Sequence, residues 1–329
     1  MSSPIKDKLK VAVLYGGQSG EHEVSLMSAE SVMAHLDREK YEITPVLISR
    51  DGEWSMPMES LRRFDVVFPV LHGPMGEDGT VQGLLTLLGV PFVGAGVVGS
   101  AVGMDKAIFK DLMRAHGLPV VAYHVVRYCQ WVTQPGQMSA KVVADLGLPC
   151  FVKPANMGSS VGITKVKSLD QLDAAMAEAF RWDRKALVER AVPRARELEV
   201  SVLGNDVLQA SIVGEIVPSR EFYDYAAKYL DKGESASALH IPAPISAEVA
   251  EHVRALALRA AEVTEARGMA RVDFLMNGET EEVFVNEINT IPGFTNISMY
   301  PKLWAASGLP YAALLDRLIA LALEASNHC

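Results

Sequence analysis

Two short apolar segments in the C-terminal third, RVDFLM (271–276) and VFVNEINTIPGF (283–294), restrict the fold of this chain more than any other feature. Between them lies Asn-Gly at 277–278, the dipeptide that most strongly signals a short β-hairpin turn. We therefore expect the two segments to pair as adjacent strands of one sheet. That pairing then decides which of their polar side chains meet.

The strand pattern collects four polar side chains on one patch of this hairpin. Because side chains alternate between the two faces of a strand, Arg271 and Asp273 share one face of the first strand. Glu287 and Asn289 likewise share one face of the second strand. If the strands pair, three oxygen ligands lie beside one cation. Such a set suits Mg²⁺, which keeps positions for water and substrate phosphates. The patch therefore predicts a metal-dependent nucleotide site.

Length and composition limit the class of protein. A chain of 329 residues is too long for one ordinary core and predicts two or three domains. Hydrophobic residues make up 49% and charged residues 22%, which indicates a globular enzyme rather than a disordered chain. The net charge of −9 and the scattered basic residues argue against a nucleic-acid partner. A few lysines inside a pocket still suffice to bind phosphates.

Several features favour a cytoplasmic protein with no membrane partner. Cys129, Cys150 and Cys329 are odd in number and lack a CxxC pattern, so we expect reduced thiols. The N-terminal MSSPIKDKLK is polar and predicts no signal peptide. The segment 79–104 has no charged residue, but its glycines and Pro91 argue against a membrane span. We expect helix, short strand, glycine turn and helix there instead.

The order of predicted elements indicates an α/β and α+β protein in three parts. In the first part, 1–105, strands alternate with helices and predict a Rossmann-like parallel sheet; the strands are expected at 10–15, 41–49, 65–73 and 91–96. The second part, 106–192, begins with a helix at 106–116. Strands are then expected at 120–126, 150–155 and 186–191, and helices at 137–146 and 168–180. The third part, 193–329, starts with strands at 197–204 and 208–216 and ends with helices at 246–267 and near 310–325.

Two familiar nucleotide motifs do not account for a nucleotide site. GAGVVG (94–99) fits the pattern GxGxxG, but residues 114 and 119, about twenty positions further on, are Arg and Pro instead of an acid. The motif also follows the fourth predicted strand instead of the first, which disfavours a nicotinamide cofactor. No GxxxxGK[ST] occurs, so a Walker-type phosphate loop is absent from the sequence.

FVKPANMGSSVGI (151–163) is the better candidate for phosphate binding. An apolar strand places Lys153 at its end, and a loop rich in glycine and serine follows. Glycines let backbone N–H groups approach anionic oxygens, serines add donors, and the lysine supplies a point charge. A plain solvent loop explains the glycines and serines but not the lysine.

Three further charged residues allow both a functional and an ordinary interpretation. Lys106 begins a predicted helix, where terminal amides assist phosphate binding, although a surface lysine is the simpler explanation. Glu189 and Glu197 flank an extended segment and can accept from an adenine amino group and ribose hydroxyls. Solvated surface glutamates are equally common.

Segments that follow the first and third strands add candidates for a small-molecule site. Glu21 follows the glycine loop GGQSGEHEVS, where it can hold an ammonium group or act as an acid at a helix N-terminus. His72 follows the third predicted strand, where a structural and a functional role are equally plausible. The tyrosine-rich polar segment 222–233 suits an active-site flap, and an exposed aromatic loop is the alternative.

With these residues in place, the chain resembles the D-alanine–D-alanine ligases of the ATP-grasp superfamily. Seven motifs occur in the family's order, which is specific although each motif alone is weak: GGQSGEHEVS, LHGPMGEDGTVQG, GMDK, VKPANMGSSVG, FYDYAAKY, RVDF and NEINTIPGFTNISMYP. The resemblance covers nearly the whole chain. It implies a pre-ATP-grasp N-terminal domain followed by a two-part ATP-grasp fold that grips ATP between two sheets, and it implies a homodimer.

The resemblance also implies the reaction and the role of each residue. ATP phosphorylates one D-alanine, and the amine of a second attacks the acylphosphate to give a dipeptide for peptidoglycan synthesis. The implied ligands of Mg²⁺ or Mn²⁺, with two ions expected, are Asp273, Glu287 and Asn289. The implied ATP contacts are Lys106, Lys153 and Lys228 to phosphates, Glu189 to adenine and Glu197 to ribose.

Other residues of the resemblance belong to the amino-acid substrates. Glu21 is implied to orient the ammonium of the first D-alanine, with Ser159 and Tyr229 linked to it and His72 beside that substrate. Arg271 and the Gly293 N–H are implied to form the oxyanion hole. Ser298 and Met299 are implied to bind the carboxylate of the second substrate. Related D-lactate ligases tend to lack the flap tyrosine, so Tyr229 favours an amine nucleophile, D-alanine before D-serine. The alternatives are another ATP-grasp carboxylate–amine ligase, a non-catalytic nucleotide-binding regulator and a nicotinamide oxidoreductase.

Overall fold

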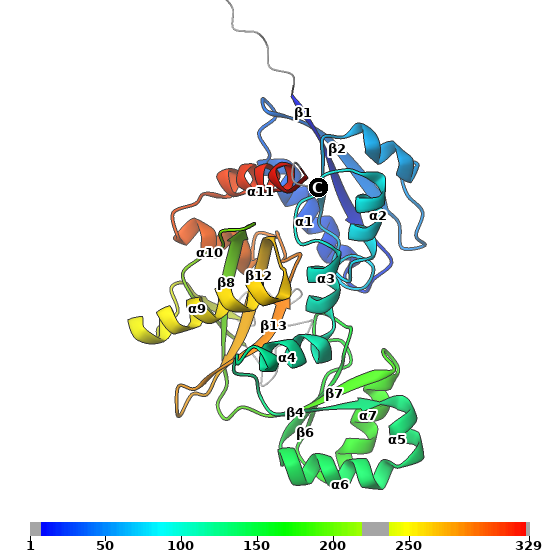
Figure 1. Ribbon diagram of the computed structural model, residues 1–329, viewed down its shortest axis with the longest axis vertical. Helices are drawn as coiled ribbons and strands as arrows, with labels where there is room; N and C mark the ends of the chain where they lie inside the picture. Colours follow the sequence, from blue (N-terminus) through cyan, green and yellow to red (C-terminus); the bar gives the residue numbers. More distant parts are fainter. Residues whose placement is uncertain (1–7, 219–236, 327–329) are drawn as a thin grey trace, which may run out of the picture.

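Three β-sheets follow one another along the long axis of the molecule (Figure 1). The computed structural model describes residues 8–218 and 237–326. The predicted flap 222–233, with Lys228 and Tyr229, therefore lies outside the described residues. The sheets have strand orders β2-β1-β3, β4-β7-β5-β6 and β11-β10-β8-β12-β13, and β9 pairs with β8 at the side of the last one.

The N-terminal sheet is parallel, as the alternation of strands and helices predicts. It contains β1 (Leu9–Gly16), β2 (Tyr41–Ile48) and β3 (Val66–Pro69), and helix α1 (His22–His35) follows the first strand. The short helix η1 (Met58–Arg63) precedes β3. The buried residues of β1 and β3 form two apolar clusters, one on each face of the sheet.

The predicted strand at 91–96 is wrong. Only Phe92 bridges to Val67, through backbone hydrogen bonds of 2.8 and 2.9 Å on its two sides. The chain leaves the sheet at Gly94, whose φ of +103° is a conformation that glycine tolerates and other residues rarely adopt. The helices α2 (Thr80–Leu88) and α3 (Val97–Met104) flank this segment, as the sequence predicts.

The second sheet is antiparallel and lies at the far end of the molecule from the N-terminal sheet (Figure 1). Helix α4 (Lys106–Ala115) leads into it; its strands and helices are β4 (Tyr123–Arg127), α5 (Tyr128–Thr133), α6 (Pro135–Leu146), β5 (Cys150–Pro154), β6 (Thr164–Val166), η2 (Leu169–Gln171), α7 (Leu172–Phe180) and β7 (Lys185–Arg190). The sequence does not predict α5. Cys129 and Cys150 are free thiols.

The third sheet carries the predicted hairpin. Its elements are β8 (Arg196–Gly204), β9 (Gln209–Ala210), β10 (Gly214–Val217), β11 (Ala238–His240), α9 (Ala247–Thr264), β12 (Gly268–Met276) and β13 (Val283–Asn289). Helix α9 covers one face with small and branched apolar side chains. The strand expected at 208–216 is divided into β9 and β10, and Arg254 donates to the carbonyls of Ala210 and Ser211 where β9 ends.

The C-terminal helices join the first and third sheets. Helix α10 (Met299–Ala306) packs against β8, and α11 (Tyr311–Ser326) lies against α1 and the N-terminal sheet (Figure 1). Leu314, Leu318 and Ile319 of α11 share one core with the strands of the first part. Among the described residues no single helix is long and apolar enough to cross a membrane; the pair α10–α11, bent by 105°, passes by length and composition only.

Candidate active site

The hairpin brings the four predicted polar residues together. Arg271 pairs in register with Asn289, and Asp273 pairs with Glu287. The strands are antiparallel, as predicted, but the connection is a six-residue loop, 277–282, instead of a two-residue turn at Asn-Gly. A hydrogen bond of 2.8 Å from the Asn277 N–H to the Glu282 carbonyl closes this loop.

A β-bulge makes the patch possible. The register shifts between Asp273 and Phe274, so that Phe274 pairs with Val285 and one extra residue lies in β13. Without that shift, Val285 and Glu287 would fall on the same face of a regular strand. With the shift, Val285 is buried against α9 while Glu287 and Asn289 line the cavity on the opposite face.

Arg271 is held by two carboxylates. Its Nε and Nη2 donate to the two oxygens of Asp273, both at 2.7 Å, and its Nε lies 3.0 Å from Oε2 of Glu199. The Nδ2 of Asn289 also donates to Asp273, at 3.0 Å. Glu199 on β8 is buried and was not predicted, although the alternation of Glu197 and Glu199 in RELEVSVLG already places both on one strand face.

Lys106 lies beside this patch. It is the first residue of α4, and Asp105 caps the helix by accepting from the N–H groups of Ala107 and Ile108, both at 3.1 Å. The Lys106 Nζ donates to the Met157 carbonyl at 2.7 Å and lies 3.5 Å from Glu287. The surface position that was the simpler expectation for this lysine is therefore wrong, since Lys106 is buried.

Lys153 belongs to a buried cluster with Glu189 and Lys110. Glu189 lies 2.5 Å from Lys153 and 2.9 Å from Lys110. Burial alone would raise the pKa of Glu189, but the two ammonium groups outweigh it and lower this pKa to about 2. Burial lowers the pKa of Lys110, whereas Glu189 raises that of Lys153 against the effect of burial. Lys110, which lies one helical turn after Lys106, was not predicted from the sequence.

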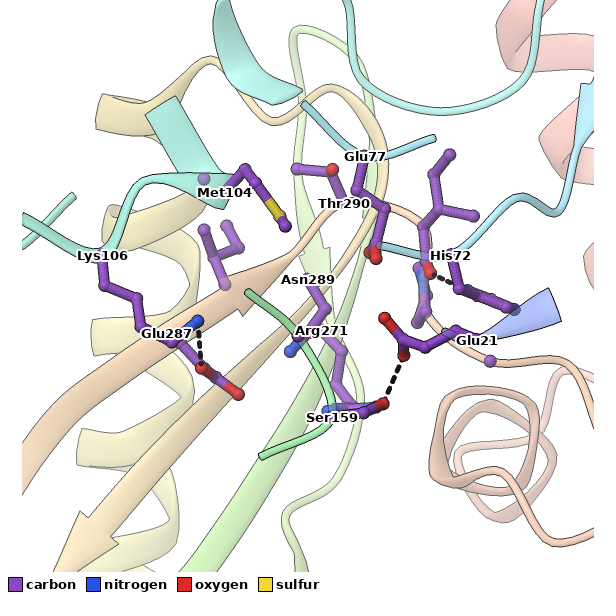
Figure 2. A pocket seen from close by; sticks show the side chains of 16 residues that line it. Glu21, His72, Glu77, Met104, Lys106, Ser159, Arg271, Glu287, Asn289 and Thr290 are labelled. Atoms are coloured by element: carbon purple, nitrogen blue, oxygen red, sulfur yellow. Dashed lines mark hydrogen bonds and ion pairs between the residues drawn. The ribbon is translucent and has the colours of Figure 1, made fainter. Parts of the chain in front are cut away.

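Glu21, Ser159 and His72 approach the patch from the other side (Figure 2). The Ser159 hydroxyl donates to Oε1 of Glu21, so the glycine-rich loop of the second sheet reaches the start of α1. The His72 Nδ1 lies 3.2 Å from the Ile291 carbonyl, and its Nε2 lies 3.1 Å from the hydroxyl of Ser28. Burial lowers the pKa of His72, so its ring is neutral at pH 7.

Glu77 is a further carboxylate at this side of the cavity, and it was not predicted from the sequence. Its Oε2 accepts from the Gly73 N–H at 2.7 Å. Burial and the neighbouring Glu21 raise the pKa of Glu77 to about 8. At neutral pH Glu77 is therefore mostly protonated. Its position in the motif LHGPMGEDGTVQG, five residues after His72, is the sequence signal that indicates this carboxylate.

The loop after β13 closes the cavity. Gly293 lines it together with Ile291 and Pro292. Ser298 accepts from the Thr295 N–H at 3.0 Å, and a Cβ at position 293 would lie 2.7 Å from the Ser298 hydroxyl. Ser298 and Met299 are not part of the cavity wall, and the Met299 side chain is buried with Ile216 and Leu303. Of these two residues, only Ser298 has a polar side chain to offer a substrate.

Glu197 lies on β8, away from this cavity wall. It stands opposite Leu275 of β12 and is partly buried. The predicted ribose contact is therefore on the same sheet as the hairpin, two residues before Glu199 in β8.

The donor set fits a hard divalent cation that also binds phosphate. Within 8–218 and 237–326, no three Asp, Glu, His or Cys side chains gather as a metal cluster. The candidate ligands are instead two carboxylates and one amide, whose Nδ2 bonds to Asp273 and leaves its Oδ1 as the acceptor. A magnesium ion bound there would complete its octahedron with water and phosphate oxygens.

A glycine-rich loop from one antiparallel sheet and a carboxylate-bearing hairpin from another thus share one lysine-lined cavity (Figure 2). This arrangement is the ATP-grasp fold of ATP-dependent carboxylate–amine ligases.

Comparison with known proteins gives the family. The model described as D-ala D-ala ligase C-terminus matches residues 112–320, and that described as D-ala D-ala ligase N-terminus matches 10–63 and 55–95. A D-alanine–D-alanine ligase of Deinococcus radiodurans is 50% identical over an alignment of 340 positions, which covers 96% of this chain and 99% of that protein. The chain belongs to the D-alanine–D-alanine ligase family.

Two solved structures share the fold. The D-alanine–D-alanine ligase from Coxiella burnetii has a TM-score of 0.85 at 36% identity, covering 98% of this chain and 96% of that one. The VanG D-Ala:D-Ser ligase from Enterococcus faecalis also has a TM-score of 0.85, at 35% identity, covering 96% of this chain and 100% of that one. The fold alone therefore does not distinguish the second substrate.

Proposed function

We propose that this enzyme joins two D-alanines to D-alanyl-D-alanine at the expense of ATP, through a D-alanyl phosphate, for peptidoglycan synthesis. The observation that carries the proposal is that Glu287 and Asn289 line one cavity with Glu21 and Ser159, and that Asn289 bonds to the third candidate ligand, Asp273. A phosphate site beside an ammonium site is what a ligase of amino acids needs.

The lysines and the hairpin serve the nucleotide in this proposal. Lys106 and Lys153 would bind phosphates, and Glu287, which lies 3.5 Å from the Lys106 Nζ, would be a ligand of the cation. Bound Mg²⁺ or Mn²⁺, with two ions proposed, neutralises charge on the phosphoryl group that is transferred. The phosphoryl group needs mainly positioning and charge compensation, because it passes through a loose transition state. Glu189 and Glu197 are proposed to contact adenine and ribose.

The opposite side of the cavity serves the amino acids. Glu21 binds the ammonium of the first D-alanine, Ser159 fixes the rotamer of Glu21, and the neutral His72 ring lies beside this substrate. Arg271 and the Gly293 N–H donate to the oxyanion that forms when the second amine attacks. Ser298 and the Met299 backbone take the second carboxylate.

The flap is proposed to exclude water from the acylphosphate, which otherwise hydrolyses. Its Lys228 and Tyr229 are assigned on sequence resemblance, to phosphate and to the Glu21–Ser159 pair respectively. We further propose a cytoplasmic homodimer with domains at 1–105, 106–192 and 193–329.

D-alanine is proposed as the second substrate before D-serine. The 50% identity to the Deinococcus radiodurans D-alanine–D-alanine ligase supports this choice over the 35% identity to the VanG D-Ala:D-Ser ligase.

Isotope transfer tests both the product and the intermediate. The enzyme is incubated with ATP, Mg²⁺, D-alanine labelled with ¹⁸O in its carboxylate, and D-serine at the same concentration as D-alanine. The dipeptides and the released phosphate are identified by mass spectrometry. We expect D-alanyl-D-alanine as the main dipeptide and one ¹⁸O in each released phosphate. Unlabelled phosphate would contradict the acylphosphate route, and a mixed dipeptide as main product would contradict the choice of D-alanine.

A further inference from the structure

Glu199 belongs to a row of three carboxylates that crosses three strands. Asp273 on β12 stands directly opposite Glu199 on β8 and directly opposite Glu287 on β13. All three side chains are on the face of the sheet that α9 does not cover. Like charges in directly opposite positions destabilise a sheet, so a row of this kind requires nearby cations.

Arg271 is the cation shared by two members of that row. Its Nε lies 2.7 Å from Asp273 Oδ1 and 3.0 Å from Glu199 Oε2. The side chains of Arg271, Asp273 and Glu199 are 17%, 14% and 7% exposed, so the charges are mostly removed from water. The same nitrogen atom of Arg271 therefore faces both carboxylates at once.

The hydrogen bonds of Asp273 would compete with the binding of a divalent cation. At least three of its roughly four acceptor positions are taken, two by Arg271 and one by Asn289. A divalent cation at Asp273 would displace these donors and would repel the guanidinium. Arg271 then needs a second carboxylate if it is to stay in the cavity.

We infer that Glu199 is a positioning residue that retains Arg271 when a divalent cation takes Asp273. Glu199 thereby separates the guanidinium that faces the reacting carbonyl from the carboxylate that faces the phosphates. The inference rests on the proposed function, in which Asp273 is a metal ligand. It predicts that Glu199 affects cation affinity through Arg271, although Glu199 itself binds no cation.

The same sheet offers a matched control on its opposite face. Glu215 on β10 is also buried and accepts from Nε and Nη2 of Arg196, at 2.5 and 2.7 Å. Glu215 thus resembles Glu199 in burial, in strand environment and in its arginine partner. A purely structural ion pair would behave alike at both positions.

Mn²⁺ binding provides a readout other than activity. Mn²⁺ is titrated against full-length protein saturated with a non-hydrolysable ATP analogue, and free Mn²⁺ is followed by electron paramagnetic resonance. We expect Glu199→Gln to raise the Kd for Mn²⁺ by about tenfold, because it removes a charge that lies 3.0 Å from Nε of Arg271 in a mostly buried ion pair. Glu215→Gln should leave the Kd unchanged even if it lowers the melting temperature.

A double variant separates positioning from simple charge attraction. In an Arg271→Gln background no guanidinium competes for Asp273, so adding Glu199→Gln should leave the Kd unchanged. An equal rise in both backgrounds, or no rise in the single variant, would overturn the inference while the metal site stands. If Asp273→Asn binds Mn²⁺ as tightly as the parent protein, the metal assignment fails and the inference fails with it.

Discussion

The hydroxyl of Ser159 donates a hydrogen bond to Oε1 of Glu21, although 138 residues separate the two. This contact joins the glycine-rich loop, which is proposed to bind phosphate, to the start of α1, which is proposed to bind an ammonium group. Gly158 makes the approach possible, because a Cβ at that position would lie 2.7 Å from Oε2 of Glu21. The Ser159–Glu21 hydrogen bond thus connects the two halves of the proposed substrate site, and the absence of a Cβ at Gly158 leaves room for it.

Gly158→Ala should therefore weaken binding of the first D-alanine. The added methyl group displaces Glu21, so we expect a KM for D-alanine raised about tenfold with a smaller change in the KM for ATP. Gly136→Ala is the control, since nothing lies within 4 Å of a Cβ there. Steady-state kinetics with each substrate varied checks the prediction, and equal rises in both KM values would contradict it.

Ser28 should matter for catalysis more than its burial alone suggests. Its hydroxyl lies 3.1 Å from His72 Nε2 and accepts from the Phe294 N–H at 3.3 Å, one residue after Gly293. Ser28→Ala removes both contacts, so we expect kcat to fall about tenfold as the Gly293 loop loses its position.

Ser25→Ala is the matched control for Ser28→Ala. Ser25 lies on the same helix, is equally buried, and bonds to the Gly16 N–H and the Val70 carbonyl at 2.8 and 2.6 Å. Both variants should lose about 1–3 kcal/mol of unfolding free energy, because each leaves buried groups without a partner. If kcat falls equally in both, Ser28 has only a structural role.

Glu189 should make the free energy of unfolding decrease at acidic pH. Its pKa of about 2 lies below the ordinary value of 4.5, so its ionised form stabilises the fold fully above pH 4.5. That contribution is lost as the pH falls from about 4.5 towards 2. Glu189→Gln leaves the buried Lys110 and the mostly buried Lys153 without their nearest carboxylate, and we expect a loss of about 3–5 kcal/mol at pH 7.

Urea unfolding of the parent protein and Glu189→Gln from pH 7 to pH 3 checks this expectation. The difference between the two should shrink as the pH falls below 4.5. Lys110→Met should lower the free energy of unfolding less than Glu189→Gln does, because Glu189 keeps Lys153 as a partner at 2.5 Å. A difference that stays constant with pH would contradict the assigned pKa.

Two substitutions on paired positions of the hairpin should separate metal binding from bond formation. Asn289→Ala removes a proposed ligand, so we expect about tenfold more Mg²⁺ for half-maximal rate. Arg271→Ala removes a proposed oxyanion donor, and we expect kcat to fall by about 10²–10³ while nucleotide still binds. Magnesium titrations of the rate and nucleotide binding by calorimetry distinguish the two. Equal damage to nucleotide binding would show that the assigned division of roles is wrong.

The sequence predicted those parts of the site that depend on local patterns. The alternation of side chains placed Arg271 with Asp273, and Glu287 with Asn289, before any sheet was known. The bulge that turns Val285 away from Glu287 was not foreseen, because it depends on what α9 covers. The parallel N-terminal sheet followed from the order of strands and helices.

The residues that were missed depend on contacts distant in the sequence. Lys110 looks like an ordinary helix lysine until Glu189, from a strand 79 positions later, is seen 2.9 Å away. Glu199 acquires its role only when β8 lies beside β12. The strand expected at 91–96 was wrong because the backbone turn at Gly94 outweighs the apolar composition of that segment.

D-alanine-dependent phosphate release tests the proposed function most directly. Folded protein is incubated with ATP and Mg²⁺, and phosphate is measured with D-alanine, with L-alanine and with neither. The proposed ligase releases phosphate with D-alanine, in a one-to-one ratio to D-alanyl-D-alanine, and stays at the background rate with L-alanine. Folded protein that releases no phosphate with D-alanine, or releases it equally with both enantiomers, would contradict the proposal.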